Sequence, residues 1–306
     1  MREKNYKGAN DMIDPFDYKE PACATCGGKE FYSPDKDAPA GRIPIRRVIE
    51  KADEAYNKND MAEAGRLLEY WQKEAEALGD ASGELSVTDE LIGYYRKTGN
   101  AEKGLAAVAR ALELLSKLDL KNTVSGATIL LNAATTMKAF GKAEEGLPLY
   151  DEAEKVYLAN LKENDVLFAG LYNNKALALT DAGKYEEAES CYKKAIDVMT
   201  LQDSAGNLDA AVSFVNLAVL LRTRAENDGD NGGNNGESDK EKITDCLFKA
   251  YGLLTDEKNQ KNGYYAFVLS KCAPAFGAFG YTRIENELKK ESDEIYERNR
   301  NQRNIF

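Results

Sequence analysis

The sequence repeats with a period of 42 residues. Gly99, Gly141 and Gly183 are each separated by 42 residues, and two further columns of identical residues keep the same step. The second column is Ala111, Ala153 and Ala195, and the third is Asn132, Asn174 and Asn216. Three columns with one period indicate a repeat architecture, in which each unit buries its apolar face against its neighbours. The chain is therefore predicted to be a stack of similar units.

The period is interrupted once. The step from Ala195 to Ala250 is 55, and the step from Ala250 to Ser292 is 42 again, so the longer step contains an insertion of 13. The segment ENDGDNGGNNGESDKE, residues 226–241, is rich in Gly, Asn and Asp and has nothing to bury. Its acidic residues have a faint calcium-loop spacing but lack the closing Glu. We predict a flexible, solvated insert at 226–241.

Each unit has the pattern of two amphipathic helices. The segments ATILLNAATTMKAFGK and AEEGLPLYDEAEKVYLANL place apolar residues at a spacing of roughly 3.6, with Gly141 as the left-handed stop between them. Small residues recur in mid-helix, where close packing needs short side chains. They are Ala134, Ala176, Ala218 and Ala273 in first helices, and Ala111, Ala153, Ala195, Ala250 and Ser292 in second helices. We predict an all-α solenoid of about six antiparallel helix pairs.

The segment GKYEEAESCYKKAI, residues 183–196, resembles the tetratricopeptide repeat (TPR). It has the Gly before the second helix, the small residues Ala188 and Ala195, and the aromatic Tyr192. The usual TPR period is ~34. The 42-residue period and the segment YNNKALAL, residues 172–179, are more similar to the longer repeats of the kinesin light chain type, although Lys175 stands where that family is usually apolar.

The resemblance covers most of the chain. The similar units are 82–122, 123–163 and 164–206, followed by the interrupted unit 207–257 and by 258–300, with 43–80 as a divergent first unit. The predicted organisation is an irregular extension over 1–41, a TPR-like solenoid over 42–300 and a tail over 301–306. The resemblance implies a right-handed superhelix whose first helices line a concave groove that binds a protein or an extended peptide.

The column Asn132, Asn174 and Asn216 is the main candidate for a binding site. Ala or Leu would be better helix formers there, whereas an Asn amide offers both donors and an acceptor. The resemblance implies that these residues bind the backbone of an extended peptide. Asn173 lies on the same helix face and has no Asn at its position in the neighbouring units. The alternative is that these amides bond a neighbouring helix and shape the solenoid.

Four cations are predicted to accompany these amides. Arg96, Lys138 and Arg222 share one first-helix position, and Lys271 occupies the position of the Asn column in a later unit. Positive charge in the groove of an acidic protein would favour an acidic peptide or a free C-terminal carboxylate. The alternative is an ordinary solvated face.

The composition excludes several classes of function. The chain has 41 basic and 52 acidic residues, a net charge of −11, and no histidine. A nucleic-acid partner is not expected, because phosphate binding needs a basic face. The absence of His removes His-based acid–base catalysis, Ser-His triads and most catalytic metal sites. The acidic pairs Glu144–Glu145 and Glu186–Glu187 open second helices, where negative charge suits the helix dipole. We predict that the chain is not an enzyme.

Localisation is predicted from what the chain lacks. The N-terminal segment MREKNYKGANDMIDPFDYKE contains no apolar stretch like that of a signal peptide. No run approaches the roughly 20 apolar residues that cross a bilayer. Five Cys without a secretion signal fit a reducing compartment. We therefore expect a cytoplasmic protein that does not bind membranes.

The segment CATCGG contains Cys23 and Cys26 and resembles one knuckle of a zinc ribbon. Zinc takes four ligands and the second knuckle is absent, so two chains would have to pool their knuckles. A redox dithiol is a further alternative, although the thioredoxin-type strand–helix context is missing. Cys191 and Cys246 fall in one repeat column and, with Cys272, are interpreted as packing residues.

The leading hypothesis is a scaffold that binds a protein or peptide in its groove without catalysis or a cofactor. The alternative is a metal- or thiol-dependent module, in which Cys23 and Cys26 act and the solenoid recruits partners. A DNA-binding regulator is disfavoured, because residues 1–41 contain four Pro and supply no helix-turn-helix.

Overall fold

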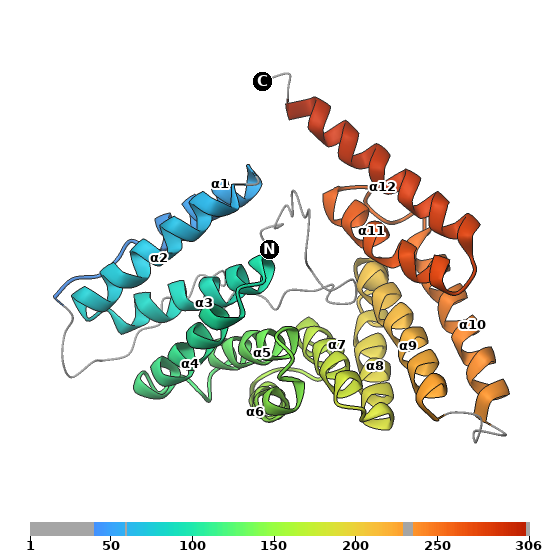
Figure 1. Cartoon of the computed structure of the whole chain (residues 1–306), viewed down its shortest axis with the longest axis horizontal. Helices are drawn as coiled ribbons and strands as arrows, with labels where there is room; N and C mark the ends of the chain where they lie inside the picture. The colour runs from blue at the N-terminus through green and yellow to red at the C-terminus, as the bar shows by residue number, and fades with distance from the viewer. Residues whose placement is uncertain (1–39, 59, 229–234, 304–306) are drawn as a thin grey trace. The chain divides into compact units, whose positions relative to one another are not determined.

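The structure is a computed structural model that describes residues 40–58, 60–228 and 235–303 (Figure 1). These residues form twelve α-helices and one 3₁₀ turn, and there is no β-strand among them. The predicted all-α class is confirmed. The helices divide into two compact units between Glu163 and Asn164.

The N-terminal unit contains three helix pairs. Its helices are α1 (Ile45–Asn57), α2 (Met61–Leu78), α3 (Ala81–Thr98), α4 (Ala101–Lys117), α5 (Val124–Ala139) and α6 (Ala143–Asn160). Within each pair the two helices pack along each other across a short turn, so they are antiparallel. The first pair, α1 and α2, occupies the predicted divergent unit 43–80.

The C-terminal unit contains the other three pairs. Its elements are α7 (Val166–Asp181), α8 (Tyr185–Thr200), the 3₁₀ turn η1 (Asp203–Gly206), α9 (Asn207–Asp228), α10 (Asn235–Leu254), α11 (Gly263–Ala278) and α12 (Thr282–Arg303). The described chain therefore has the six helix pairs that the sequence predicts.

Left-handed glycines end the first helices, as predicted. The φ angles of Gly99, Gly141 and Gly183 are 69°, 76° and 71°. At Gly183 the next amide, Lys184 N, donates back to Leu179 O at 2.8 Å. This bond satisfies a carbonyl that the helix end would otherwise leave without a partner.

The predicted small residues lie where the helices cross. All of them are fully buried or very nearly so, in first helices and in second helices alike. They are Ala134, Ala176, Ala218 and Ala273 in first helices, and Ala111, Ala153, Ala195, Ala250 and Ser292 in second helices. A larger side chain at such a crossing would push the helices apart, because interhelical distances depend on the contacting side chains. The 42-residue period therefore reflects the regular spacing of these helix crossings along the chain.

The insert differs from the prediction. A step of 42 from Asp181 would end α9 at residue 223, but α9 continues to Asp228. A step of 55 from Tyr185 would begin α10 at residue 240, but α10 begins at Asn235. Most of residues 226–241 is thus helical, and the extension of α10 carries a buried residue, Asp239. The prediction of a flexible insert with nothing to bury was wrong for these parts.

The first helices of each unit form a layer of their own. In the N-terminal unit α3 contacts α1 and α5, and in the C-terminal unit α9 contacts α7 and α11. Among the described helices, no second helix contacts the next second helix as extensively. We call α1, α3 and α5 the first-helix layer of the N-terminal unit, and α7, α9 and α11 that of the C-terminal unit.

Candidate functional site

Buried polar residues are concentrated in the two first-helix layers. The side chains of Asp89, Asn132, Asn173, Asn174 and Asn216 are all buried. Buried amides and carboxylates are stable only when they are hydrogen-bonded, so each must be accounted for by its partners.

In the N-terminal unit Asn132 pairs with a carboxylate. Asn132 Nδ2 on α5 donates to Asp89 Oδ1 on α3 at 2.8 Å, and both side chains are buried. Hydrogen bonds to a charged acceptor are stronger than neutral ones. Asn132 therefore ties two adjacent first helices together.

In the C-terminal unit Asn216 makes the corresponding bond. Asn216 Nδ2 on α9 donates to Asn173 Oδ1 on α7 at 3.1 Å. Ser213 Oγ lies 3.4 Å from the same oxygen and donates to it. All three side chains are buried. Asn173, which the repeat pattern left isolated, is thus the acceptor for the next first helix.

Asn174 behaves differently from the other two members of its column. Its Nδ2 donates to Gly170 O at 3.0 Å, one turn earlier in the same helix. Asn132 and Asn216 each bond a residue 43 positions earlier, and 43 positions before Asn174 stands Leu131, which has no acceptor in its side chain. Residues of one sequence column therefore make two kinds of hydrogen bond. Asn132 and Asn216 bond to the preceding first helix, and Asn174 bonds within its own helix.

The second amide atom of Asn173 is an exception to the usual pairing of buried groups. Asn173 Nδ2 is buried and has no hydrogen-bond partner among the atoms of the structure. A buried donor without an acceptor costs about 1–3 kcal/mol relative to a satisfied one. The C-terminal first-helix layer thus contains one buried amide donor, Asn173 Nδ2, without an acceptor.

Two of the four predicted cations lie at the ends of first helices. Arg96 and Lys138 are in the last turns of α3 and α5, where positive charge suits the helix dipole. Arg96 Nη1 lies 3.5 Å from Thr136 Oγ1, and Lys138 is buried.

In the C-terminal unit the cations contact aromatic rings. Arg222 Nη1 donates to Ala278 O at 3.1 Å, and its guanidinium lies 4.4 Å from the ring centre of Phe279. The Lys271 ammonium lies 5.6 Å from the ring centre of Phe267. Arg222 therefore binds a carbonyl at the end of the next first helix, a structural use that the charge pattern did not indicate.

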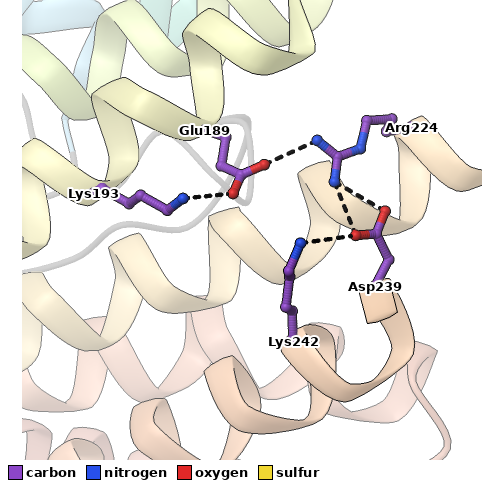
Figure 2. A network of polar contacts seen from close by, with 5 residues as sticks. All are labelled: Glu189, Lys193, Arg224, Asp239 and Lys242. Carbon is purple, nitrogen blue, oxygen red and sulfur yellow. Dashed lines mark hydrogen bonds and ion pairs between the residues drawn. The ribbon is translucent and has the colours of Figure 1, made fainter. Parts of the chain in front are cut away.

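An ion network that no sequence pattern indicated joins three helices (Figure 2). Arg224 on α9 contacts Asp239 on α10 through both carboxylate oxygens, at 3.0 and 2.9 Å, and contacts Glu189 on α8 at 2.9 Å. Lys193 contacts Glu189 at 2.7 Å, and Lys242 lies 3.5 Å from Asp239.

Two cations of this network lower the pKa of Glu189. Burial acts to raise the pKa of Glu189, but the hydrogen bonds from Lys193 and Arg224 lower the pKa further than burial raises it. Arg224 and Asp239 both belong to the extra turns of α9 and α10. The network therefore anchors the inserted segment to the body of the repeat.

The predicted packing role of three cysteines agrees with their surroundings. Cys191, Cys246 and Cys272 are free thiols and buried. Burial raises the pKa of Cys272 to about 12, and it is the main cause that raises the pKa of Cys246 to about 11. Cys23 and Cys26, the predicted zinc or redox residues, lie outside the described ranges. Within those ranges no group of three or more Cys, Asp or Glu is placed to hold a metal ion.

A hollow on the surface lies apart from these residues. It has a volume of about 420 Å³ and runs along α10 beside Lys240, Thr244 and Phe248, and it is not lined by the amides or cations described above. In the described part of the chain, no helix is both long and apolar enough to span a membrane.

Comparisons with known proteins agree with this architecture. The family model of the tetratricopeptide repeat matches residues 167–228, which cover α7 from its second residue and all of α8 and α9. No curated protein matches the sequence.

Solved structures extend the likeness in fold. One contains the nearly identical TPR-like repeats of a kinesin light chain candidate from Podosopora anserina; it is 14% identical, with a TM-score of 0.50 over 69% of this chain and 94% of its own. A single-substitution form of those repeats is 13% identical, with a TM-score of 0.51 over 71% of this chain and 96% of its own. BtubC (BKLC) from P. vanneervenii is 19% identical, with a TM-score of 0.48 over 87% and 94%.

At these identities the solved structures establish the fold alone, whereas the family match establishes the repeat itself in α7 to α9. The 42-residue period indicates the same kind of helix pair in the other units. Residues 167–228 therefore match the tetratricopeptide repeat family, and the described helix pairs have a fold similar to that of the TPR-like repeats of the kinesin light chain candidate.

Proposed function

We propose that this chain is a non-catalytic protein-binding scaffold, which holds an extended segment of a partner protein along its first-helix layers. The observation that carries the proposal is the set of buried polar side chains in these layers, since apolar residues would pack there at lower cost. TPR folds bind protein partners as a class, and residues 167–228 contain three of these amides.

Asparagine suits this function because its amide can hydrogen-bond to the backbone of a peptide whatever the side chains of that peptide are. Asn132 and Asn216 donate one hydrogen bond each to a neighbouring helix, and an Asn amide has further hydrogen-bonding capacity. The structural and the binding interpretations of the Asn column are therefore compatible. The helix-to-helix bonds hold each amide in a defined orientation before a ligand arrives, which lowers the entropy cost of binding.

We further propose that acidic residues of the partner are favoured. Arg96, Lys138 and Lys271 place positive charge on first helices of a chain whose net charge is −11. Electrostatic attraction of this kind chiefly raises the association rate and is weakened by salt.

The test is a selection of a displayed library of random 12-residue peptides on the full chain. Peptides recovered on the wild type are then measured against Asn132/Asn174/Asn216→Ala. A matched outer-face variant is Glu144/Glu186/Glu187→Ala, which changes three exposed residues of second helices. The proposal expects weakened binding only in the first variant.

Loss of fold is separated from loss of binding by two controls. Circular dichroism shows whether the triple Asn variant is still helical, and Lys271→Ala leaves both interhelical amide bonds in place. Equal binding by the wild type and all folded first-helix variants would reject the proposal, and so would failure of the library to yield any peptide.

A further inference from the structure

Asn262 and Gly263 form an Asn-Gly pair at the start of α11. Asn262 is exposed and caps this helix, because its Oδ1 accepts a hydrogen bond from Tyr265 N at 3.0 Å. Gly263 is the first residue of α11, and the first amides of a helix have no acceptor within it. An Asn side chain and the amide that follows it are the two groups that close a succinimide ring.

The backbone of Asn262 favours this ring closure. Its ψ is −172°, which places Gly263 N gauche to the Asn262 Cβ, and Gly263 has no side chain to obstruct the approach. Asn100 is the matched comparison, because it is also exposed and its Oδ1 accepts from Lys103 N at 3.2 Å at the start of α4. Its ψ is 85°, which places the next amide anti to Cβ, and the next residue is Ala101. The two caps make the same bond but differ in their ability to close a ring.

The cap bond of Asn262 also stabilises the charge that the reaction creates. When the amide nitrogen adds to Cγ, negative charge develops on Oδ1, the atom that already accepts from Tyr265 N. The positive end of the α11 dipole lies at the same end of the helix and favours that charge. Tyr265 N is therefore an oxyanion donor for a reaction within its own chain.

We propose that Asn262 is a self-modification site, at which the folded chain deamidates to aspartate and isoaspartate. Gly263 N loses its proton to solvent and attacks Asn262 Cγ, so that an N–Cγ bond forms. The Cγ–Nδ2 bond breaks, and ammonia leaves with a proton returned by solvent. Water then opens the succinimide at Cγ to give isoaspartate's isomer aspartate, or at the backbone carbonyl carbon to give isoaspartate. The net change consumes one water and releases one ammonia, and it does not depend on the proposed function.

The two products differ in their effect on α11. Aspartate caps a helix as well as Asn does, and its charge suits the helix N-terminus. Isoaspartate adds a methylene to the backbone directly after Lys261. The Lys261 carbonyl accepts from Arg298 Nη2 at 2.9 Å, and the Lys261 ammonium lies 2.5 Å from Glu291 Oε1, with both partners on α12. The longer backbone must therefore break the cap or one of these contacts.

The test is to incubate the full chain in mildly alkaline buffer and to follow Asn262 and Asn100 by peptide mass spectrometry. Electron-transfer fragmentation distinguishes isoaspartate from aspartate. We expect Asn262 to convert to both products at least about tenfold faster than Asn100. Gly263→Ala should slow the conversion of Asn262 at least about tenfold, since the added methyl group hinders the attacking nitrogen.

A second variant separates the fold from the dipeptide. Ala101→Gly creates an Asn-Gly pair at Asn100, which should stay slow in the folded chain because its next amide is anti to Cβ. In urea, Asn100 and Asn262 of this variant should react at similar rates. The inference is overturned if Asn262 reacts only in urea, if it yields aspartate alone, or if Ala101→Gly makes Asn100 as reactive as Asn262 in the folded chain.

The effect on the helix is measured by urea unfolding. Fresh Asn262→Asp should have the midpoint of the fresh wild type, and the aged wild type should have a lower one. Aged Gly263→Ala, in which Asn262 is spared while other sites age, is the control and should keep its midpoint. Equal midpoints of the fresh and the aged wild type would show that isoaspartate does not disturb α11.

Discussion

Asn216 Nδ2 on α9 donates to Asn173 Oδ1 on α7 at 3.1 Å, across 43 residues of sequence. The repeat period is 42, so the equivalent of Asn216 in the preceding unit is Asn174. The bond from Asn216 goes to Asn173, the residue just before that equivalent. The same rule describes Asn132 and Asp89. A hydrogen bond at this offset connects adjacent first helices, and adjacent Asn residues in a repeat can therefore have different roles.

Removal of the Asn216 amide should destabilise the chain. Asn216→Ala leaves the buried Asn173 oxygen without its nearer donor, and we expect a loss of about 1–2 kcal/mol in the free energy of unfolding, measured in urea. Asn286→Ala, at an exposed site on α12, should change stability by less than about 0.5 kcal/mol. Equal effects of the two substitutions would contradict a structural role for the amide pair.

Arg224 should be the most sensitive residue of the network in Figure 2. Its side chain is 14% exposed, and those of Glu189 and Asp239 are 15% and 6% exposed. Arg224→Ala leaves the buried carboxylate of Asp239 without its bidentate partner and removes one of the two cations that contact the half-buried Glu189, which should cost about 3–5 kcal/mol. Lys193→Ala and Lys242→Ala remove cations that are 62% and 51% exposed, and should each cost less than about 1 kcal/mol. Urea unfolding of the three variants decides whether this order holds.

The same network should make stability depend on pH in the acidic range. The pKa of Glu189 is lowered from its ordinary value of 4.5, so the folded chain releases this proton more readily than the unfolded chain. The resulting stability is fully present above the unfolded pKa and is lost as the pH falls through the lower folded value. Urea midpoints measured from about pH 5 down to pH 3 should fall less steeply in Glu189→Gln than in the wild type. Parallel curves would show that Glu189 does not contribute.

Gly183 tests the backbone geometry of the turn between paired helices. Its φ is 71°, and an added Cβ would meet nothing within 4 Å. Gly183→Ala should therefore destabilise through the left-handed backbone alone, by about 1–2 kcal/mol. Gly183→Asn should cost less, because Asn tolerates this conformation better. Thermal unfolding compares the two variants, and an equal loss would point to a cause other than backbone conformation.

Cys272 should be unreactive in the folded chain. It is 1% exposed, and burial raises the pKa of its thiol to about 12, so almost no thiolate exists at pH 8. Iodoacetamide should modify Cys272 only after urea is added, as followed by peptide mass spectrometry. Rapid labelling in native buffer would show that α11 opens locally.

Much of the fold follows from residue spacing. The columns of Gly and Ala predicted the helix ends and the helix crossings, because a left-handed turn needs a residue without a Cβ and a close crossing needs a short side chain. The predicted packing role of Cys191 and Cys246 followed from their shared repeat column, and both are buried. Each of these requirements acts on one residue at a time, so it is visible in the sequence.

The insert shows the limit of such local rules. Residues 226–241 have the composition of a loop, yet 226–228 belong to α9 and 235–241 belong to α10. The side chain of Asp239 is buried because Arg224 lies beside it, and this ion pair outweighs the weak helix propensity of the segment. Composition could not predict this, since Arg224, Asp239 and Glu189 come from three helices.

By itself, the sequence determined that this protein is a stack of helix pairs with a 42-residue period, and it singled out the asparagines as unusual. Only the tertiary structure decided what each asparagine bonds, because a hydrogen bond depends on which atom the next helix presents. Asn132 meets the carboxylate of Asp89, Asn216 meets the amide of Asn173, and Asn174 bonds to Gly170 in its own helix. The period places these residues on the same face, and packing between first helices decides their hydrogen-bond partners.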